Sequence, residues 1–296
     1  MKKAIFLILT LSIVTVAVIL LQKSSSSDKE ESRGVIATIY PLYYITKEIV
    51  GDEVEVKRLI KAGSEIHSFS PTPKDMVELS NSDILITLGD RLEPWVGKLS
   101  NATDVEILPL ADSLDLIHHK EHIDPHLWLD FKNDIAMVDI IEKRLSKLYP
   151  SSSEIFAKNA KSLKDKFQNI DSRYSDGLKE CKQDTILVTH NAFGYMQRVY
   201  GFKSISIMGI FAHSRPNASK IALLSDEIKK KSIKVLFFDP ISSNKSASQL
   251  ATDMKLTLLP LYPLGNISID DEKRGDDMFK LLSKNLTSLQ RGLECL

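Results

Sequence analysis

The sequence is poor in cysteine, with only Cys181 and Cys295 among 296 residues. Two thiolates are too few for the sulfur-rich sites that hold structural zinc. Both residues suit an oxidising compartment, where a disulfide between them persists. A disulfide requires Cα atoms within about 7 Å of each other. The sequence does not give that distance, so a disulfide and two free thiols both stay open.

The sequence also lacks an excess of either charge, since Lys+Arg and Asp+Glu both number 39. Proteins that bind nucleic acid usually present a basic face, and no long basic run occurs here, so we expect no nucleic-acid partner. Hydrophobic residues make up 43% and charged residues 26%, as in ordinary globular proteins. The length favours two domains of about 100–200 residues each.

Charge is absent from residues 4–21, AIFLILTLSIVTVAVILL, which follow a positive start, MKK. The run is 18 residues long, close to the ~17–25 that span a bilayer and longer than a typical signal core. We expect a secretory signal or, as the length favours, an uncleaved anchor with the Ser-rich stretch 22–33 as its tether. No cysteine follows the run, so a lipid on an N-terminal cysteine is not expected. Residues 34–296 are then predicted to be periplasmic or otherwise extracytoplasmic.

After Gly34, short apolar runs alternate with amphipathic segments. Strands are predicted at 35–40, 54–60, 83–88, 105–110, 185–189, 203–207, 234–239 and 255–259. Helices are predicted at 42–50, 74–81, 92–100, 191–200, 218–231 and 245–254, and from about 272 to the C-terminus. Alternation of this kind predicts an α/β protein with mainly parallel sheets.

One longer amphipathic stretch separates the two halves of this pattern. Its apolar residues, at spacings of three or four, are Phe156, Ala160, Leu163, Phe167, Ile170, Tyr174 and Leu178. This periodicity predicts a single helix of about eight turns that runs to Cys181. We therefore predict two α/β lobes, 34–150 and 182–296, joined by a linking helix within 151–181.

The candidate ligands are histidines, of which the sequence has seven: His67, His118, His119, His122, His126, His190 and His213. His67 lies in the loop after one predicted strand, and His190 directly follows another in the second lobe. Open α/β sheets bind ligands at the carboxyl ends of their strands. These two histidines can therefore face each other across a cleft.

A third histidine, His126, lies in HIDPHLWLD. Asp124-Pro125 fixes the turn before it, and the apolar LWL after it is expected to anchor the segment in the core. Three neutral imidazoles suit zinc, with Zn–N distances of about 2.0–2.1 Å. The other histidines are less informative. HHKEH (118–122) either collects zinc weakly or is a solvated loop, and His213 is expected on the surface before a helix.

Four stretches resemble the solute-binding proteins of zinc and manganese ABC transporters. They are AGSEIHSFSPTPKDM (62–76), LGDRLEPW (88–95), DPHLWLD (124–130) and THNAFGYMQRVYG (189–201). The resemblance runs from Gly34 to near the C-terminus. It implies two α/β lobes bridged by a long helix, with the metal in the interlobe cleft. It also implies that His67, His126 and His190 are the metal ligands.

The resemblance implies a protein that captures Zn²⁺ and delivers it to a membrane permease driven by an ATPase. We also expect the protein to be a monomer. Manganese-selective members commonly have Glu where this chain has His190, and imidazole favours zinc over manganese. A manganese- or iron-binding homologue and an adhesin of the same fold stay open as alternatives. A three-histidine zinc hydrolase is a further alternative, but no general base of the H-E-x-x-H kind is present, and we expect no enzyme.

The sequence departs from the family at the last ligand. Many members supply an Asp there, at a position that we assign to Tyr262, and tyrosine is an uncommon zinc ligand. Water, Asp239 or a residue of the 118–122 loop is left as the fourth ligand.

Overall fold

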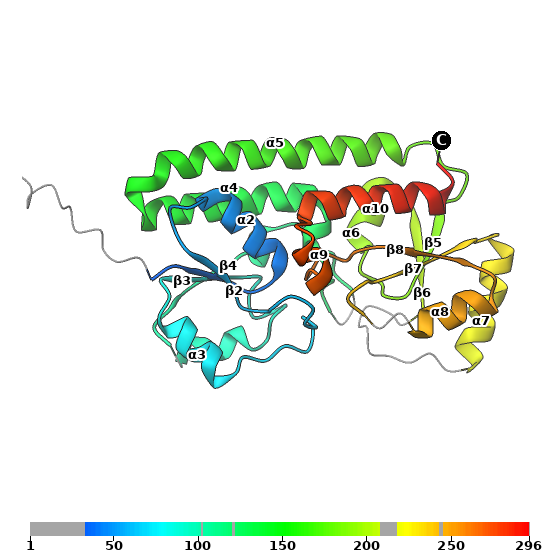
Figure 1. The fold of residues 1–296 in the computed structure, drawn as a ribbon, viewed down its shortest axis with the longest axis horizontal. Coiled ribbons are helices and arrows are strands. Elements are labelled where there is room, and N and C mark those ends of the chain that lie inside the picture. Colours follow the sequence, from blue (N-terminus) through cyan, green and yellow to red (C-terminus); the bar gives the residue numbers. More distant parts are fainter. Residues whose placement is uncertain (1–32, 102, 120–121, 208–217, 243–244, 296) are drawn as a thin grey trace, which may run out of the picture. The chain divides into compact units, whose positions relative to one another are not determined.

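Two four-stranded parallel sheets form the framework (Figure 1). The computed structural model describes residues 33–101, 103–119, 122–207, 218–242 and 245–295. The first sheet has the order β2-β1-β3-β4, with strands Val56–Arg58, Val35–Ala37, Ile84–Thr87 and Glu106–Pro109. The second has the order β6-β5-β7-β8, with strands Lys203–Ser206, Thr185–Val188, Val235–Phe238 and Thr257–Pro260. Every described pair is parallel, and all eight predicted strands are confirmed within a few residues.

The helices lie on the faces of the sheets and along one side of both. In chain order they are α2 Tyr40–Val50, α3 Pro73–Ser80, α4 Phe131–Leu148, α5 Ser153–Gly177, α6 Gly194–Tyr200, α7 Ala218–Lys230, α8 Lys245–Asp253, α9 Ile269–Lys273 and α10 Met278–Leu293. Short 3₁₀ turns cover Val96–Asn101, Ala111–Ser113, Leu127–Leu129 and Pro150–Ser152.

Three predicted helices differ from the structure. The helix predicted at 92–100 is a 3₁₀ turn that begins only at Val96, and Pro94 disfavours helical backbone in Glu93 before it. The helix predicted at 191–200 begins at Gly194. The predicted C-terminal helix is two helices, since α9 ends before Gly275, whose φ is +69°. Asp277 then caps the start of α10 by accepting from the N–H of Lys280.

The predicted long helix is confirmed as α5, which has 25 residues and buries its apolar face. Figure 1 shows α5 running along both sheets, and it packs against α2, α4 and α10. The predicted extension to Cys181 is wrong, because the helix ends at Gly177, a poor helix former. Beyond it, Cys181 forms a disulfide with Cys295, which fixes the end of the chain beside the end of α5.

Helix α4 has 18 residues, lies along α5 and was not predicted from the sequence. Its start is marked by Asp130, whose side chain accepts a hydrogen bond from the N–H of Lys132. Its buried apolar residues recur at helical spacing: Phe131, Met137, Val138, Ile141 and Leu145. The same periodicity that predicted α5 was therefore available here. Both α4 and α10 pack against the linking helix α5.

One apolar core joins the two sheets. It contains Val35 and Ile86 from the first sheet, Ile186 and Phe237 from the second, and the buried face of α5. Two smaller clusters lie on the opposite faces of the sheets, one beneath α3 and the other beneath α7 and α8. Both faces of each sheet are covered, as parallel sheets require. Gly34–Leu296 accordingly forms one compact unit.

Several expectations concern residues outside the described ranges. These are the anchor or signal at 4–21, most of the tether, and His213. Within the described residues, no helix is both long enough and apolar enough to cross a membrane.

A carboxyl group is buried in this framework without a partner. Asp134, in the first turn of α4, is fully buried, and neither of its oxygens has a hydrogen-bond partner among the described residues. Burial, with the negative charge of Asp130 adding to it, raises the pKa of Asp134 well above its usual value. At neutral pH the unfolded chain carries this carboxyl ionised, whereas the folded protein favours its protonated form. The difference lowers the free energy of unfolding at neutral pH.

We expect Asp134→Asn to raise the free energy of unfolding at neutral pH. The wild type should lose stability as pH rises from the unfolded pKa of about 4 towards the raised folded value. At a pH above both the unfolded and the folded pKa, each unit of that shift lowers the free energy of unfolding by about 1.4 kcal/mol. Urea unfolding between pH 4 and 8 measures this. The control Asp176→Asn changes an exposed carboxylate on α5, and equal pH profiles for wild type and Asp134→Asn would contradict the prediction.

Candidate metal site

The three predicted ligands come together. His67, His126 and His190 each offer one ring nitrogen, and these atoms all lie within 4.8 Å of one another. Their ring centroids are 5.0–5.5 Å apart. Within the described part of the chain, no other His, Cys, Asp or Glu group of this kind is found. The spacing leaves room for one ion with a nitrogen from each ring.

His126 is the most rigidly held of the three. It is fully buried and directly precedes the 3₁₀ turn Leu127–Leu129, whose side chains are buried as predicted. Its ring Nδ1 lies 2.8 Å from Asp124 Oδ1, which also accepts the His126 backbone N–H at 3.0 Å. Trp128 in the same turn donates its indole N–H to the carbonyl of Pro263 at 2.7 Å. The ring therefore has a fixed position and orientation.

The Asp124 carboxylate determines which nitrogen of His126 faces the ion. Burial acts to raise the pKa of Asp124, but the hydrogen bond and charge of His126 outweigh it, and the pKa is lowered. An ionised Asp124 accepts the Nδ1 proton, which leaves the Nε2 lone pair for a metal. This Nε2 is buried and has no hydrogen-bond partner among the described residues. A buried nitrogen without a partner is costly unless something binds it, and a zinc ion fits that need.

A glycine lets Asp124 take this position. A Cβ on Gly194, at the start of α6, would lie 2.5 Å from Asp124 Oδ2. The next residue, Tyr195, donates its hydroxyl to the Asp124 carbonyl at 3.0 Å. Helix α6, which lies between β5 and β6 of the second sheet, therefore supports a ligand that precedes α4.

His67 lies in a loop that hydrogen bonds from the segment after β8 hold in place. Its loop lies between β2 and α3, and its backbone N–H donates to Glu65 Oε1 at 3.0 Å. Asn266 donates its side-chain amide to the carbonyls of Lys61 and Ser64, each at 2.8 Å. The loop is thus tied to the chain that leaves β8. His67 is half-buried, whereas His190, two residues beyond β5, is 5% exposed.

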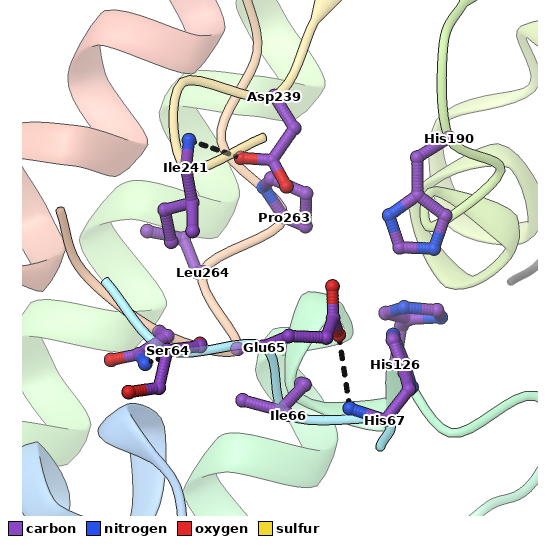
Figure 2. A pocket seen from close by; sticks show the side chains of 12 residues that line it. Ser64, Glu65, Ile66, His67, His126, His190, Asp239, Ile241, Pro263 and Leu264 are labelled. Carbon is purple, nitrogen blue, oxygen red and sulfur yellow. Dashed lines mark hydrogen bonds between the residues drawn. The ribbon is translucent and has the colours of Figure 1, made fainter. Parts of the chain in front are cut away.

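The three histidines line a small pocket at the carboxyl ends of strands from both sheets (Figure 2). Its other walls come from Ser64–Ile66, from Asp239 and Ile241 after β7, and from residues 263–266 after β8. The space open to the centres of water-sized spheres is about 30 Å³, enough for an ion or a water. Burial raises the pKa of Asp239 to about 6, and the charge of Glu65 adds to this effect.

Two candidates for the fourth ligand lie outside this pocket. The backbone of Tyr262 exchanges hydrogen bonds with the side chain of Asn285. Burial raises the pKa of the Tyr262 hydroxyl, and the negative charge of Asp271 adds to this effect. Tyr262 is not among the residues that line the pocket. In the 118–122 loop, the rings of His119 and His122 lie against each other, with centroids 4.9 Å apart. The described residues of that loop do not line the pocket either.

Sequence reasoning missed Glu65 as a pocket residue and missed the role of Asp124 as the partner of His126. Each acid stands two residues before a candidate ligand, and each accepts that histidine's backbone N–H. The repeated acid-x-His spacing was the available signal.

A family model described as the periplasmic component A of the zinc-uptake complex, ZnuA, matches residues 35–292. The chain belongs to the ZnuA family. It is 33% identical to the zinc-binding protein AdcA of Streptococcus pyogenes serotype M3, covering 98% of this chain and 61% of AdcA. It is 28% identical to the high-affinity zinc uptake system protein ZnuA of Bacillus subtilis, covering 92% and 91%. The chain thus spans about three-fifths of the length of AdcA.

Solved structures share the ZnuA fold of this chain. The Zn(II)-bound ZnuA-like domain of AdcA from Streptococcus pneumoniae superposes with a TM-score of 0.79 at 31% identity, covering 88% of this chain and 98% of that domain. The laminin-binding protein Lmb of Streptococcus agalactiae, described as a bifunctional adhesin and metal transporter, has a TM-score of 0.79 at 27% identity, with the same coverage. The arrangement of two lobes with mainly parallel sheets is therefore that of the family.

We expect Asp124→Asn to weaken zinc binding by about 10–100-fold, the usual cost of losing a partner behind a metal-bound histidine. The amide no longer stabilises the Nδ1–H tautomer as a carboxylate does. Competition titration against a chromophoric zinc chelator measures the loss. Asp104→Asn, which alters an exposed carboxylate, is the control, and wild-type affinity in Asp124→Asn would show that the pair does not support the ligand.

Proposed function

We propose that this protein captures Zn²⁺ outside the cytoplasm and delivers it to an ABC permease and its ATPase for import. The observation that carries the proposal is the convergence of three imidazole nitrogens within 4.8 Å, at a pocket that holds little more than an ion. Imidazole nitrogens favour zinc over ions such as manganese, which prefer oxygen ligands. The names of the relatives, zinc-binding and zinc-uptake proteins, support the same cargo.

The proposed ligands are His67, His126 and His190, and their origins suit capture and release. His126 belongs to the rigid core, whereas His67 is on a half-buried loop. In our proposal, residues 34–150 and 182–296 act as the two lobes around the ion, and 151–181 links them. The proposal also includes a monomer with residues 4–21 as a membrane anchor, and the family description as a periplasmic component supports a location outside the cytoplasm.

The pocket argues against a zinc hydrolase. Sites for organic ligands usually have volumes of about 300–1,000 Å³, whereas the space here is about 30 Å³. We therefore assign the ion as cargo and not as a catalyst. An adhesin function, as described for Lmb, is the second candidate. A growth defect confined to zinc-poor medium favours transport, and loss of attachment with normal growth favours adhesion.

We expect His190→Ala to lower zinc affinity by more than the ~10–100-fold that loss of a supporting partner costs, because a direct ligand is removed. His213→Ala and deletion of residues 118–122 should each have little effect. Isothermal titration of the zinc-free variants with Zn²⁺ compares them. Equal losses in all three variants would overturn the ligand assignment.

His190→Glu should shift the preference from zinc towards manganese, because a carboxylate oxygen is a harder ligand than imidazole. The ratio of Zn²⁺ to Mn²⁺ affinities measures the shift, with His190→Gln as the matched control that lacks the charge. An unchanged ratio in His190→Glu would count against selection by ligand hardness.

A further inference from the structure

A short segment after β8, residues 263–266 and here called the spacer, contacts the surroundings of two proposed zinc ligands. Its residues line the pocket (Figure 2). In the proposed division of the chain they belong to the second lobe, whereas His67 and His126 belong to the first. We propose that the spacer sets the separation of these two histidines and that Asn266 is the residue that positions His67. This inference rests on the proposed function, because it takes zinc at the histidines as given.

The start of the spacer is fixed to the turn that follows His126. Trp128, two residues after His126, donates its indole N–H to the carbonyl of Pro263 at 2.7 Å. The Trp128 side chain is buried in the core, and its ring centroid lies 5.5 Å from that of His126. Pro263 therefore has a defined position relative to this ligand.

The middle of the spacer touches both ligand segments at once. A Cβ on Gly265 would lie 2.3 Å from Ile66 Cδ1 and 2.9 Å from Trp128 Cζ2. Ile66 directly precedes His67, so a glycine at this point lets the neighbours of both ligands approach the same backbone. The His67 loop and the His126 turn are thus held apart by the width of one chain.

The end of the spacer holds the turn before His67. Asn266 is buried, and its side-chain amide donates to the carbonyls of Lys61 and Ser64, each at 2.8 Å. Its Oδ1 accepts the N–H of Ile267 at 2.9 Å, which aims the NH₂ group at the turn. One side chain from the second lobe therefore binds both ends of the turn 61–64, which leads directly to His67.

The position of His67 depends on this turn, because His67 itself is only half-buried. The backbone adds one bond beside Asn266, from the N–H of Gly63 to the carbonyl of Ile267 at 2.9 Å. Without the Asn266 amide, the Gly63 bond and the packing of Ile66 would remain. Ordering of His67 would then have to accompany ion binding, and the conformational entropy lost in that step would lower the affinity.

The test measures zinc affinity by chelator competition in Asn266→Asp, Asn266→Ala and Asn159→Ala. Asn266→Asp keeps the size of the side chain but places an oxygen opposite two carbonyls, and Asn266→Ala removes the amide. Asn159 also donates its amide to a backbone carbonyl, that of Ile49 at 3.0 Å, but it does not line the pocket. We expect both Asn266 variants to lose about tenfold in affinity, as for other supporting partners of a ligand, and Asn159→Ala to match the wild type.

Combination with ligand variants separates positioning of His67 from a general loss of structure. If Asn266 acts through His67, then Asn266→Ala should lower affinity about tenfold in a His190→Ala background and should change nothing in a His67→Ala background. Chelators of graded affinity keep every double variant measurable. Losses of equal size in the two backgrounds would contradict the positioning role, because they would show that the whole pocket is altered.

Amide hydrogen exchange of the zinc-free proteins gives a second readout. Asn266→Ala should speed exchange in residues 61–67 and leave exchange in 124–129 unchanged. Wild-type affinity in both Asn266 variants, or a loss of affinity without faster exchange in 61–67, would overturn the inference. Thermal unfolding identifies a variant that fails to fold, and the other Asn266 variant then replaces it.

Failure of the proposed function gives a different result. If His67→Ala binds zinc as tightly as the wild type, the proposed ligand set fails, and the role of Asn266 fails with it. The contrary outcomes for Asn266 alone leave zinc capture by the three histidines standing.

Discussion

The structure depends on one constraint, an apolar core that runs without interruption through both sheets. Buried residues of α4, α5 and α10 share one apolar core with strands of both sheets, and residues that follow β2, β5, β7 and β8 line one pocket. Hydrophobic burial is non-directional. By holding the two sheets together, it nevertheless determines where the polar loops at the ends of their strands meet. Residues separated by more than a hundred positions in sequence can thus share one ion.

The three histidines differ in how firmly the core holds them. His126 is fully buried, and its carboxylate partner Asp124 is supported by Gly194 and Tyr195 of α6. His67 is only half-buried, in a loop that is held by hydrogen bonds from Asn266 and by the packing of Ile66 against the core. This asymmetry suits the proposed capture and release of the ion. In the proposed function, the buried His126 would define the position of the ion, and the half-buried His67 would be the easier ligand to withdraw.

Much of this arrangement could be predicted from the sequence, for identifiable reasons. The strands are short apolar runs, and α5 has a clean periodicity, so both were found. The α4 helix has the same signal after Asp130 but was missed. The Cys181–Cys295 disulfide depends on how two distant segments approach each other, which local pattern does not encode. The His67, His126 and His190 set was predicted from strand ends and family resemblance.

The pocket walls were harder to predict, because they depend on packing. Glu65 gains its position from a hydrogen bond to His67, and Gly265 matters only because Ile66 and Trp128 fill the space beside it. Tyr262 was assigned to the site by its place in the sequence, whereas the chain turns its backbone towards Asn285. One-residue differences in where a loop turns decide which side chain faces the pocket.

The most direct test is an anomalous-scattering map from zinc-loaded crystals, collected on both sides of the zinc absorption edge. We predict one dominant peak, about 2.0–2.1 Å from a ring nitrogen of each of His67, His126 and His190. A dominant peak elsewhere, for instance at the 118–122 histidines, or no peak between the three rings, would contradict the account.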